Sequence, residues 1–426
     1  MQGAVRQRVL LFLLGLIVIP LGTVATILFA RGYRPSIKYG QILPTGLLVA
    51  NSYPDGAQVY VDGQLKSATN TTINLSPGSY KVEIKKEGYQ PWQKTLSIEQ
   101  EIVTRATSYL FPSVPAFKAI TANGVANPIL SPDGTKVAFS QNLPGQTSSQ
   151  LFILDLSESP LGLLNREARQ VATSTRVNFS ATRLFWSPDS RQIIALASSS
   201  AYLTNLNSQP PTDITLTLSQ ITSEWSAAKK LRDLQKMDIL PDILKNLLAT
   251  SAADLLWSPR ENKLLYTATA AAQIPGRLIR PLPGSSTQTQ NRTLTPRHYY
   301  VYDLEEDRNF EIGQVPTPTP APKKTKSPLS LSPIDMSLIL ASLSSPHPSG
   351  WSWFPNSQHL IRVDDKKVTV MEYDGQNSTV IYAGPLESRY AFPYPSSKQL
   401  LILANMSASL SASQSSLPNL FAVTLR

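Results

Sequence analysis

The chain repeats one short pattern five times, and this repetition constrains the fold more than any other feature. Each copy has an apolar run, a tight turn containing proline, and a second apolar run. The end of the first apolar run and the turn of each copy lie at 129–134, 185–190, 256–260, 353–357 and 393–397. Because proline sets φ in such turns and Asp, Asn, Ser or Gly accept the remaining dihedrals, each copy predicts a β-hairpin. One hairpin cannot bury its apolar face alone, so five copies predict stacked units of the same kind.

The turns are formed by small or polar residues and proline. They are Ser131, Pro132, Asp133, Gly134, Ser187, Pro188, Asp189, Ser258, Pro259, Pro355 and Pro395. A third apolar strand is expected after each hairpin, at 150–155, 201–203, 299–303, 368–372 and 420–423. Asp133 and Asp189 could also be interpreted as a repeated metal site, but an Asp in this place normally hydrogen-bonds its own turn.

These repeats resemble propeller units of the TolB type, which are related to WD-repeat blades. The resemblance implies a β-propeller over 116–426, with five blades expected and six as the alternative. A propeller has to join its first and last blades or expose sheet edges. The chain ends on a third strand with no fourth after it, so we expect the short strand at 117–121 to pair with 420–425.

A different pattern precedes the repeats. Apolar and polar residues alternate over 46–112, with turns between them, which predicts a small antiparallel β-sandwich. The stretches 46–49, 54–57, 59–63, 75–82 and 88–92 resemble the PEGA domain of bacterial and archaeal surface proteins. Asp55 stands where that family has Glu, and the usual Gly-Thr-Pro is absent. The resemblance implies a surface spacer or envelope-binding module without catalytic residues.

The N-terminal region contains 22 residues without a charge, at 9–30. As a helix this stretch would extend about 33 Å, close to the ~30 Å thickness of a bilayer core. It predicts an uncleaved transmembrane anchor in contact with membrane lipid, with a short cytoplasmic tail at 1–8 and a spacer at 31–45. The folded domains would then lie outside the cytoplasm of a single-pass protein. A cleaved signal peptide is the alternative, and the flanking charges do not fix the orientation.

Two insertions interrupt the repeats. The segment 223–250 predicts a helical hairpin packed on the propeller: Ser223 could cap the first helix, Trp225, Leu231 and Leu234 recur on one face, and Pro241 precedes the second helix. A lid or a partner-docking element is the alternative. The segment 314–345, rich in proline and lysine, predicts an extended loop, with an anion-binding arm as the alternative.

No pattern of catalytic, cofactor-binding or metal-binding residues is found in the sequence. The chain has no cysteine, which excludes disulfides, thiolate metal sites and thiol catalysis. The three histidines, His298, His347 and His359, lack metal-ligand spacing. The innermost strands, expected at 128–130, 183–186, 255–257, 351–353 and 390–392, contain no Asp or Glu, which a propeller glycosidase would need. The net charge of +10 is scattered, which favours solubility, with an affinity for anionic surfaces as the alternative. No nucleic-acid partner is expected.

The aromatic residues beside the turns leave one candidate ligand face. Trp186, Trp257 and Trp353 are expected in the core, with a carbohydrate-binding face as the alternative. The sequence as a whole favours a mainly β, membrane-anchored surface protein that binds or scaffolds without catalysis, with an envelope protein or polysaccharide as its partner. The alternatives are an envelope assembly factor that binds peptides at the propeller channel mouth, and a propeller hydrolase. The oligomeric state is left open.

Overall fold

The computed structural model describes residues 2–30, 33–36, 41–141, 148–157, 168–206, 210–280, 282, 284, 286–316, 350–406 and 417–425. Within these residues the chain is mainly β, as expected, and its α-helices are α1 (Gln2–Ala30), α2 (Leu218–Met237) and α3 (Asp242–Ser251). It divides into two compact units. The first comprises Met1–Leu110 and Pro281–Thr289, and the second comprises Phe111–Arg280 and Gln290–Arg426.

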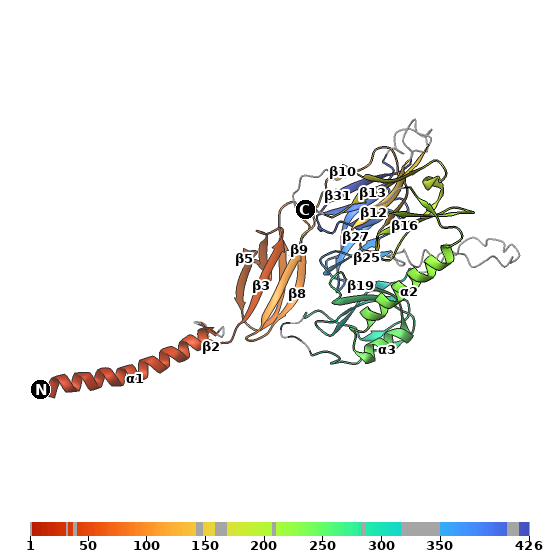
Figure 1. Ribbon diagram of the computed structural model, residues 1–426. Coiled ribbons are helices and arrows are strands. Elements are labelled where there is room, and N and C mark those ends of the chain that lie inside the picture. The colour runs from red at the N-terminus through yellow and green to blue at the C-terminus, as the bar shows by residue number, and fades with distance from the viewer. Residues whose placement is uncertain are drawn as a thin grey trace. The chain divides into compact units, whose positions relative to one another are not determined.

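The first unit contains two sheets packed as a sandwich (Figure 1). One has the order β6-β3-β9, made of β6 (Thr71–Leu75), β3 (Gly46–Tyr53) and β9 (Val103–Tyr109). The other has the order β5-β4-β7-β8, made of β5 (Gln64–Ala68), β4 (Gln58–Val61), β7 (Gly78–Lys85) and β8 (Trp92–Ile98). A separate pair is formed by β1 (Arg34–Ser36) and β2 (Gln41–Leu43). The core lies between the two larger sheets and includes Leu48, Val59, Val82, Ile84 and Trp92.

The sandwich differs from the sequence prediction in one respect. We expected antiparallel strands throughout, but β3 and β9 are parallel, from Leu47 opposite Val103 to Tyr53 opposite Tyr109. Parallel neighbours need a long crossover connection. Here the strands between β3 and β9 supply it, because most of them belong to the opposite sheet.

The membrane anchor expected at 9–30 is contradicted by the structure. Among the helices of the described residues, none combines the length and the apolar character needed to cross a bilayer. The single-pass membrane localisation depended on that anchor and is corrected with it, whereas contact with membrane lipid stays a prediction.

The second unit contains five four-stranded antiparallel sheets among its described residues (Figure 1). The first is β11 (Ala126–Leu130), β12 (Lys136–Gln141), β13 (Ser149–Asp155) and β14 (Arg169–Ser174). The second is β15 (Arg183–Trp186), β16 (Gln192–Leu196), β17 (Ala201–Asn205) and β18 (Thr212–Asp213). The third is β19 (Ala252–Trp257), β20 (Lys263–Ala268), β23 (His298–Asp303) and β24 (Arg308–Gln314), with β21 (Ala272–Gln273) and β22 (Thr293–Leu294) paired beside it. The fourth is β25 (Trp351–Trp353), β26 (His359–Val363), β27 (Lys367–Glu372) and β28 (Thr379–Ala383).

The fifth sheet joins the two ends of this unit. Its strands are β29 (Ala391–Pro393), β30 (Gln399–Ala404), β31 (Asn419–Thr424) and β10 (Phe117–Ala119). The pairing of β10 with β31 confirms the expected fourth strand, with Phe117 opposite Val423 and Ala119 opposite Phe421. The hydroxyl of Thr121 extends this contact, because it accepts a hydrogen bond from the amide of Leu420 at 2.9 Å.

Neighbouring sheets share apolar clusters. The first and second sheets pack together through Phe179, Trp186 and Ile193. The third and fourth pack through Tyr299, Trp351 and Trp353. The fifth packs against the first through residues that include Phe139, Tyr394, Leu401 and Leu420. Repeated four-stranded meanders that stack in this way are the construction of a β-propeller.

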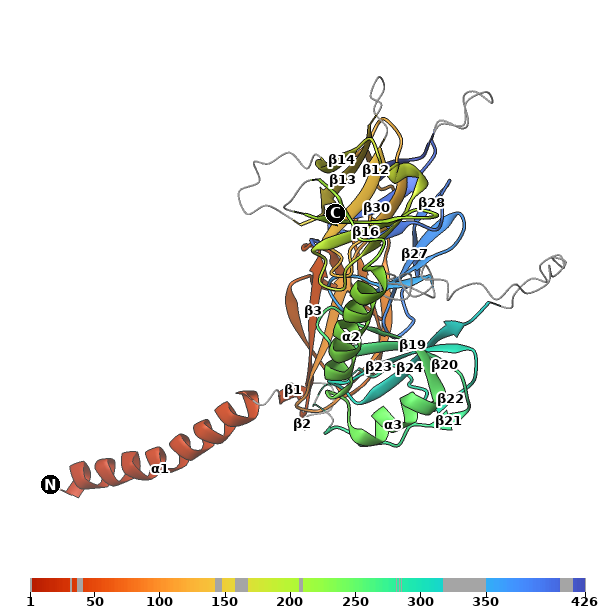
Figure 2. The same ribbon diagram turned by 45° about the vertical axis from the view of Figure 1, so that its right-hand side comes forward.

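The expected helical insertion is present, but it begins earlier than predicted, at Leu218 with Thr217 as its N-cap, so Ser223 is inside α2. Trp225 is buried against the second sheet with Phe185, whereas Leu231 and Leu234 are more than half exposed. Figures 1 and 2 agree that α2 runs from the second sheet toward the third. Most of the Pro- and Lys-rich stretch expected at 314–345 lies outside the described residues.

Candidate functional site

The five repeated turns have one geometry. In each loop the amide of the first residue donates to the carbonyl five positions later, at 2.8 or 2.9 Å. The pairs are Ser131–Lys136, Ser187–Gln192, Ser258–Lys263, Phe354–His359 and Tyr394–Gln399. The fourth residue of each loop has a positive φ of 57–70°, and these residues are Gly134, Ser190, Glu261, Ser357 and Ser397. The loops are therefore structurally equivalent, although only two of them contain Asp.

The predicted turn residues hold the loops closed. The Ser131 hydroxyl donates to Asp133 at 2.6 Å and accepts from the amide of Lys136 at 2.9 Å. Ser187 makes the matching bonds to Asp189 and to the amide of Gln192. These bonds support the structural interpretation of the two aspartates. In the part of the chain that the structure describes, no group of three or more His, Asp or Glu side chains could hold a metal ion.

The pH dependence of the first loop follows from Asp133. Its partial burial alone would raise the pKa, but hydrogen bonds from Ser131 and Thr135 outweigh burial and leave the pKa below its ordinary value. The carboxylate therefore stabilises the fold above its unfolded pKa of about 3.9, and this contribution is lost as pH falls through the folded pKa. We expect Asp133→Asn to cost about 1 kcal/mol or less at pH 7. Thermal melts should show this difference shrinking as pH falls below the unfolded pKa of about 3.9, and a difference that does not shrink on acidification would contradict the assignment.

The tryptophans chosen as a candidate ligand face do not share one environment. Trp186 is fully buried and its indole N–H donates to the carbonyl of Ile129 at 3.2 Å. Trp353 is 6% exposed and donates to the carbonyl of Leu256 at 2.9 Å. Trp257 is partly buried beside α3. The first two rings are thus used in packing and bonding between neighbouring sheets, and the structure does not bring the three together on one open face.

One other expectation about chemistry is modified. The inner strand β19 begins at Ala252, so it includes Asp254, whereas we expected inner strands free of carboxylates. His298 lies 2.6 Å from a carboxylate oxygen of Glu311, and His359 is buried next to the rings of Phe111 and Phe354. His347 lies outside the described residues.

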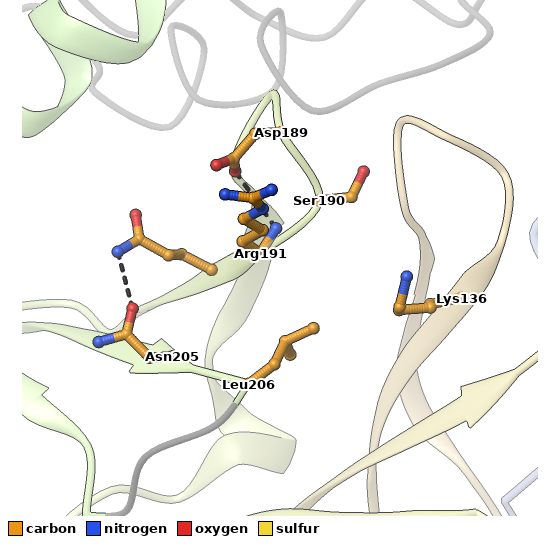
Figure 3. A pocket seen from close by; sticks show the side chains of 7 residues that line it. Lys136, Asp189, Ser190, Arg191, Asn205 and Leu206 are labelled. Carbon is orange, nitrogen blue, oxygen red and sulfur yellow. Dashed lines mark hydrogen bonds between the residues drawn. The ribbon is translucent and has the colours of Figure 1, made fainter.

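A cavity of about 720 Å³ opens between the turns of the first and second sheets (Figure 3). It is lined by Lys136, Asp189, Ser190, Arg191, Gln192, Asn205 and Leu206. Lys136 comes from the first sheet and faces the loop of the second across the opening, as Figure 3 shows. Gln192 donates to Asn205 at 2.7 Å. The volume of the cavity is in the range of small-molecule sites, which is about 300–1,000 Å³.

The sequence pointed to only one of these lining residues, Asp189. A usable signal was present, because Lys136, Gln192, Lys263, His359 and Gln399 all follow their turns at the same distance. Each is paired in register with a polar residue of the third strand: Asp155, Asn205, Asp303, Glu372 and Thr424. Alignment of the five copies would therefore have revealed a row of polar pairs at the turn end of the sheets.

Comparison with known proteins bears out the PEGA resemblance. The family model described as PEGA domain matches residues 45–113. No curated protein matches the chain. Among solved structures, TolB from Acinetobacter baumannii is 11% identical with a TM-score of 0.21, over 81% of this chain and 59% of that one. The chain thus spans less than two thirds of that TolB.

A second group of similar structures has a different activity in its name. Oligogalacturonate lyase in complex with manganese is 10% identical with a TM-score of 0.21, over 84% of this chain and 81% of that one. The oligogalacturonate lyase from Vibrio parahaemolyticus is 9% identical with a TM-score of 0.20, over 90% of each chain. The expected TolB-type likeness is found, but TM-scores of this size carry no argument about function.

Proposed function

We propose that the protein is a non-catalytic binding module associated with the cell envelope, and that its ligand enters the cavity between the first and second sheets. The observation that carries this proposal is the cavity itself. Six of its seven lining side chains are polar, and two of them, Lys136 and Arg191, are cations. The carboxylate of Asp189 accepts hydrogen bonds from Ser187 and from the amide of Arg191, so it serves the loop.

The PEGA match supports the envelope association. It covers 45–113, and the resemblance implies a surface spacer or envelope-binding role for that segment. An envelope protein or a polysaccharide is the corresponding partner.

We infer that the five sheets close into one ring, with the helical pair inserted between the second and third. The shared clusters of the first and second, third and fourth, and fifth and first sheets support this closure. The rings of Phe117 and Tyr382, 5.7 Å apart, link the fifth sheet to the fourth. At the remaining joint α2 supplies the contacts: Arg232 donates to the carbonyl of Pro188 at 2.6 Å, and Lys236 pairs with Glu261 at 2.9 Å.

The test is binding by the purified full chain to separated envelope glycans and envelope proteins. We expect saturable binding to one fraction that Arg191→Ala weakens and that Lys366→Ala, a change at an exposed lysine outside the cavity, leaves unchanged. The same preparation should give no turnover of glycosidase, esterase or peptidase substrates above a heat-treated control. Turnover that disappears in Asp189→Asn would refute the non-catalytic role, and binding insensitive to Arg191 would refute the site.

A further inference from the structure

The joint between the first and second sheets is repeated between the third and fourth. At the first joint, Trp186 donates to the carbonyl of Ile129, and the Ser190 hydroxyl accepts from the amide of Asp133 at 3.2 Å. At the second, Trp353 donates to the carbonyl of Leu256, and the Ser357 hydroxyl accepts from the amide of Arg260 at 3.0 Å. The four donors and acceptors occupy matching places in the repeat, so the two joints are equivalent.

Every residue that lines the cavity therefore has a counterpart at the second joint. In chain order the counterparts are Lys263, Asn356, Ser357, Gln358, His359, Glu372 and Tyr373. The match holds at the far end, because the amide of Leu206 donates to the carbonyl of Arg191 and the amide of Tyr373 donates to that of Gln358. One joint can thus serve as the internal reference for the other.

At the second joint the space is filled. The Tyr373 side chain is 8% exposed, and the ammonium of Lys263 lies 4.6 Å from the centre of its ring. The same ammonium pairs with Asp303 at 3.1 Å, and both side chains are 2% exposed. Burial raises the pKa of the Tyr373 hydroxyl well above its ordinary value, as do the nearby carboxylates of Glu306 and Asp303. The ring of Tyr373 thus covers the ammonium of Lys263, and the carboxylate of Asp303 neutralises its charge.

At the first joint the cavity lining contains no aromatic ring and no counterpart of the Glu372 carboxylate. Leu206 takes the place of Tyr373, and the neutral Asn205 takes the place of Glu372. Asp155, the counterpart of Asp303, is exposed and accepts from Ser157. The ammonium of Lys136 lies 3.8 Å from a carboxylate oxygen of Asp133, whose side chain is 43% exposed.

The change also alters the charge. The reference set has one cation, Lys263, and one anion, Glu372, when histidine is counted without charge. The cavity set has two cations, Lys136 and Arg191, and one anion, Asp189. Counted over these lining side chains alone, the cavity therefore carries one more positive charge than its filled counterpart.

We propose that the cavity binds an aromatic ring that carries a carboxylate. The ring would lie over Leu206 against the ammonium of Lys136, as Tyr373 lies against Lys263, and the carboxylate would pair with Arg191. A cation over an aromatic face and a guanidinium–carboxylate pair are both favourable in a partly enclosed site. The inference rests on the proposed binding function and names its ligand class.

The experiment measures binding of 3-(4-hydroxyphenyl)propanoate to the full chain by calorimetry at low salt. Its primary amide tests the carboxylate, and 3-cyclohexylpropanoate tests the aromatic ring; each should bind at least about tenfold weaker. A short peptide ending in tyrosine with a free carboxylate distinguishes two sources of the ligand. If the ligand is a protein C-terminus, the peptide should bind as tightly as the acid. If it is a free acid, the peptide should bind more weakly.

Two variants place the site. Leu206→Tyr restores the ring of the reference joint and should abolish binding, whereas the volume-conserving Leu206→Met should retain it. Arg191→Gln installs the reference residue at an exposed position and should weaken binding about tenfold, so it tests the site even if Leu206→Tyr fails to fold.

Equal binding of acid and amide, equal binding of the cyclohexyl acid, no binding of the acid, or binding unaffected by Arg191→Gln would each overturn the ligand class. The binding function fails separately, when no envelope glycan or protein binds in a way that depends on Arg191. If a glycan binds at the cavity and the aromatic acid does not, the proposed binding function stands and the inferred ligand class is refuted.

Discussion

A chain shortened by its last seven residues, 420–426, is expected to lose the cooperative folding of the second unit. Leu420, Ala422, Val423 and Leu425 are each at most 1% exposed. Burial of the three larger side chains contributes about 2 kcal/mol each, or about 6 kcal/mol before strand hydrogen bonds are counted. That is comparable with the whole stability of a typical domain, about 5–15 kcal/mol. Near-UV circular dichroism and thermal melts should show the loss.

The control is a chain that lacks only Arg426, which leaves β31 complete and should melt like the intact chain. A melting temperature of the seven-residue truncation within about 2 °C of the intact chain would contradict the expected role of β31. A second variant tests the register directly. Ala119→Cys with Phe421→Cys places two thiols directly opposite each other in an otherwise cysteine-free chain, so a disulfide should form on oxidation. Lys118→Cys with Phe421→Cys is one residue out of register and should not.

The hairpins and the joining of the chain ends could be predicted from the sequence because both follow from local rules. Proline and Ser-Pro-Asp turns specify hairpins whatever packs around them, and the loops that lack Asp reach the same geometry with Glu261 or Ser357 at positive φ. The pairing of β10 with β31 was predictable because two unpaired strands, one at each end of a repeat region, satisfy their backbone hydrogen bonds by pairing in one sheet.

The missed features depend on residues far apart in the chain. The segment Pro281–Thr289 belongs to the first unit, where Thr287 accepts from the amide of Ser97 at 3.2 Å, and no local pattern in the repeats indicates this. The parallel pairing of β3 with β9 likewise depends on which sheet each intervening strand joins.

The cavity was missed for a related reason. Its lining differs from the second joint by Leu206 in place of Tyr373, and this difference has meaning only after the two joints are known to be equivalent. Tryptophan and aspartate were considered as site residues in the sequence because their side chains are common in ligand and metal sites. Trp186 and Asp189 nevertheless serve mainly the joint and the loop, and the open space lies beside them among ordinary Lys, Arg, Asn and Leu.

Asp303→Asn is expected to destabilise the second unit by about 3–5 kcal/mol, because it leaves the ammonium of Lys263 buried without its carboxylate. The ring of Tyr373 at 4.6 Å offsets only part of this cost. The matched control is Asp365→Asn. It breaks an ion pair with Arg389 at 2.7 Å whose side chains are 78% and 61% exposed, so it should cost about 1 kcal/mol or less. Urea unfolding of the two variants measures the difference.

The double change Lys263→Met with Asp303→Leu separates the value of the pair from the cost of breaking it. Removing both charges leaves no buried ion, so most of the stability lost in Asp303→Asn should return. If Asp303→Asn costs no more than Asp365→Asn, then water or another group neutralises Lys263, and the third and fourth sheets are not sealed at their joint. The joint between the third and fourth sheets would then contain water and could not be compared with the cavity as its filled counterpart. This measurement therefore also bears on the ligand inferred for the cavity.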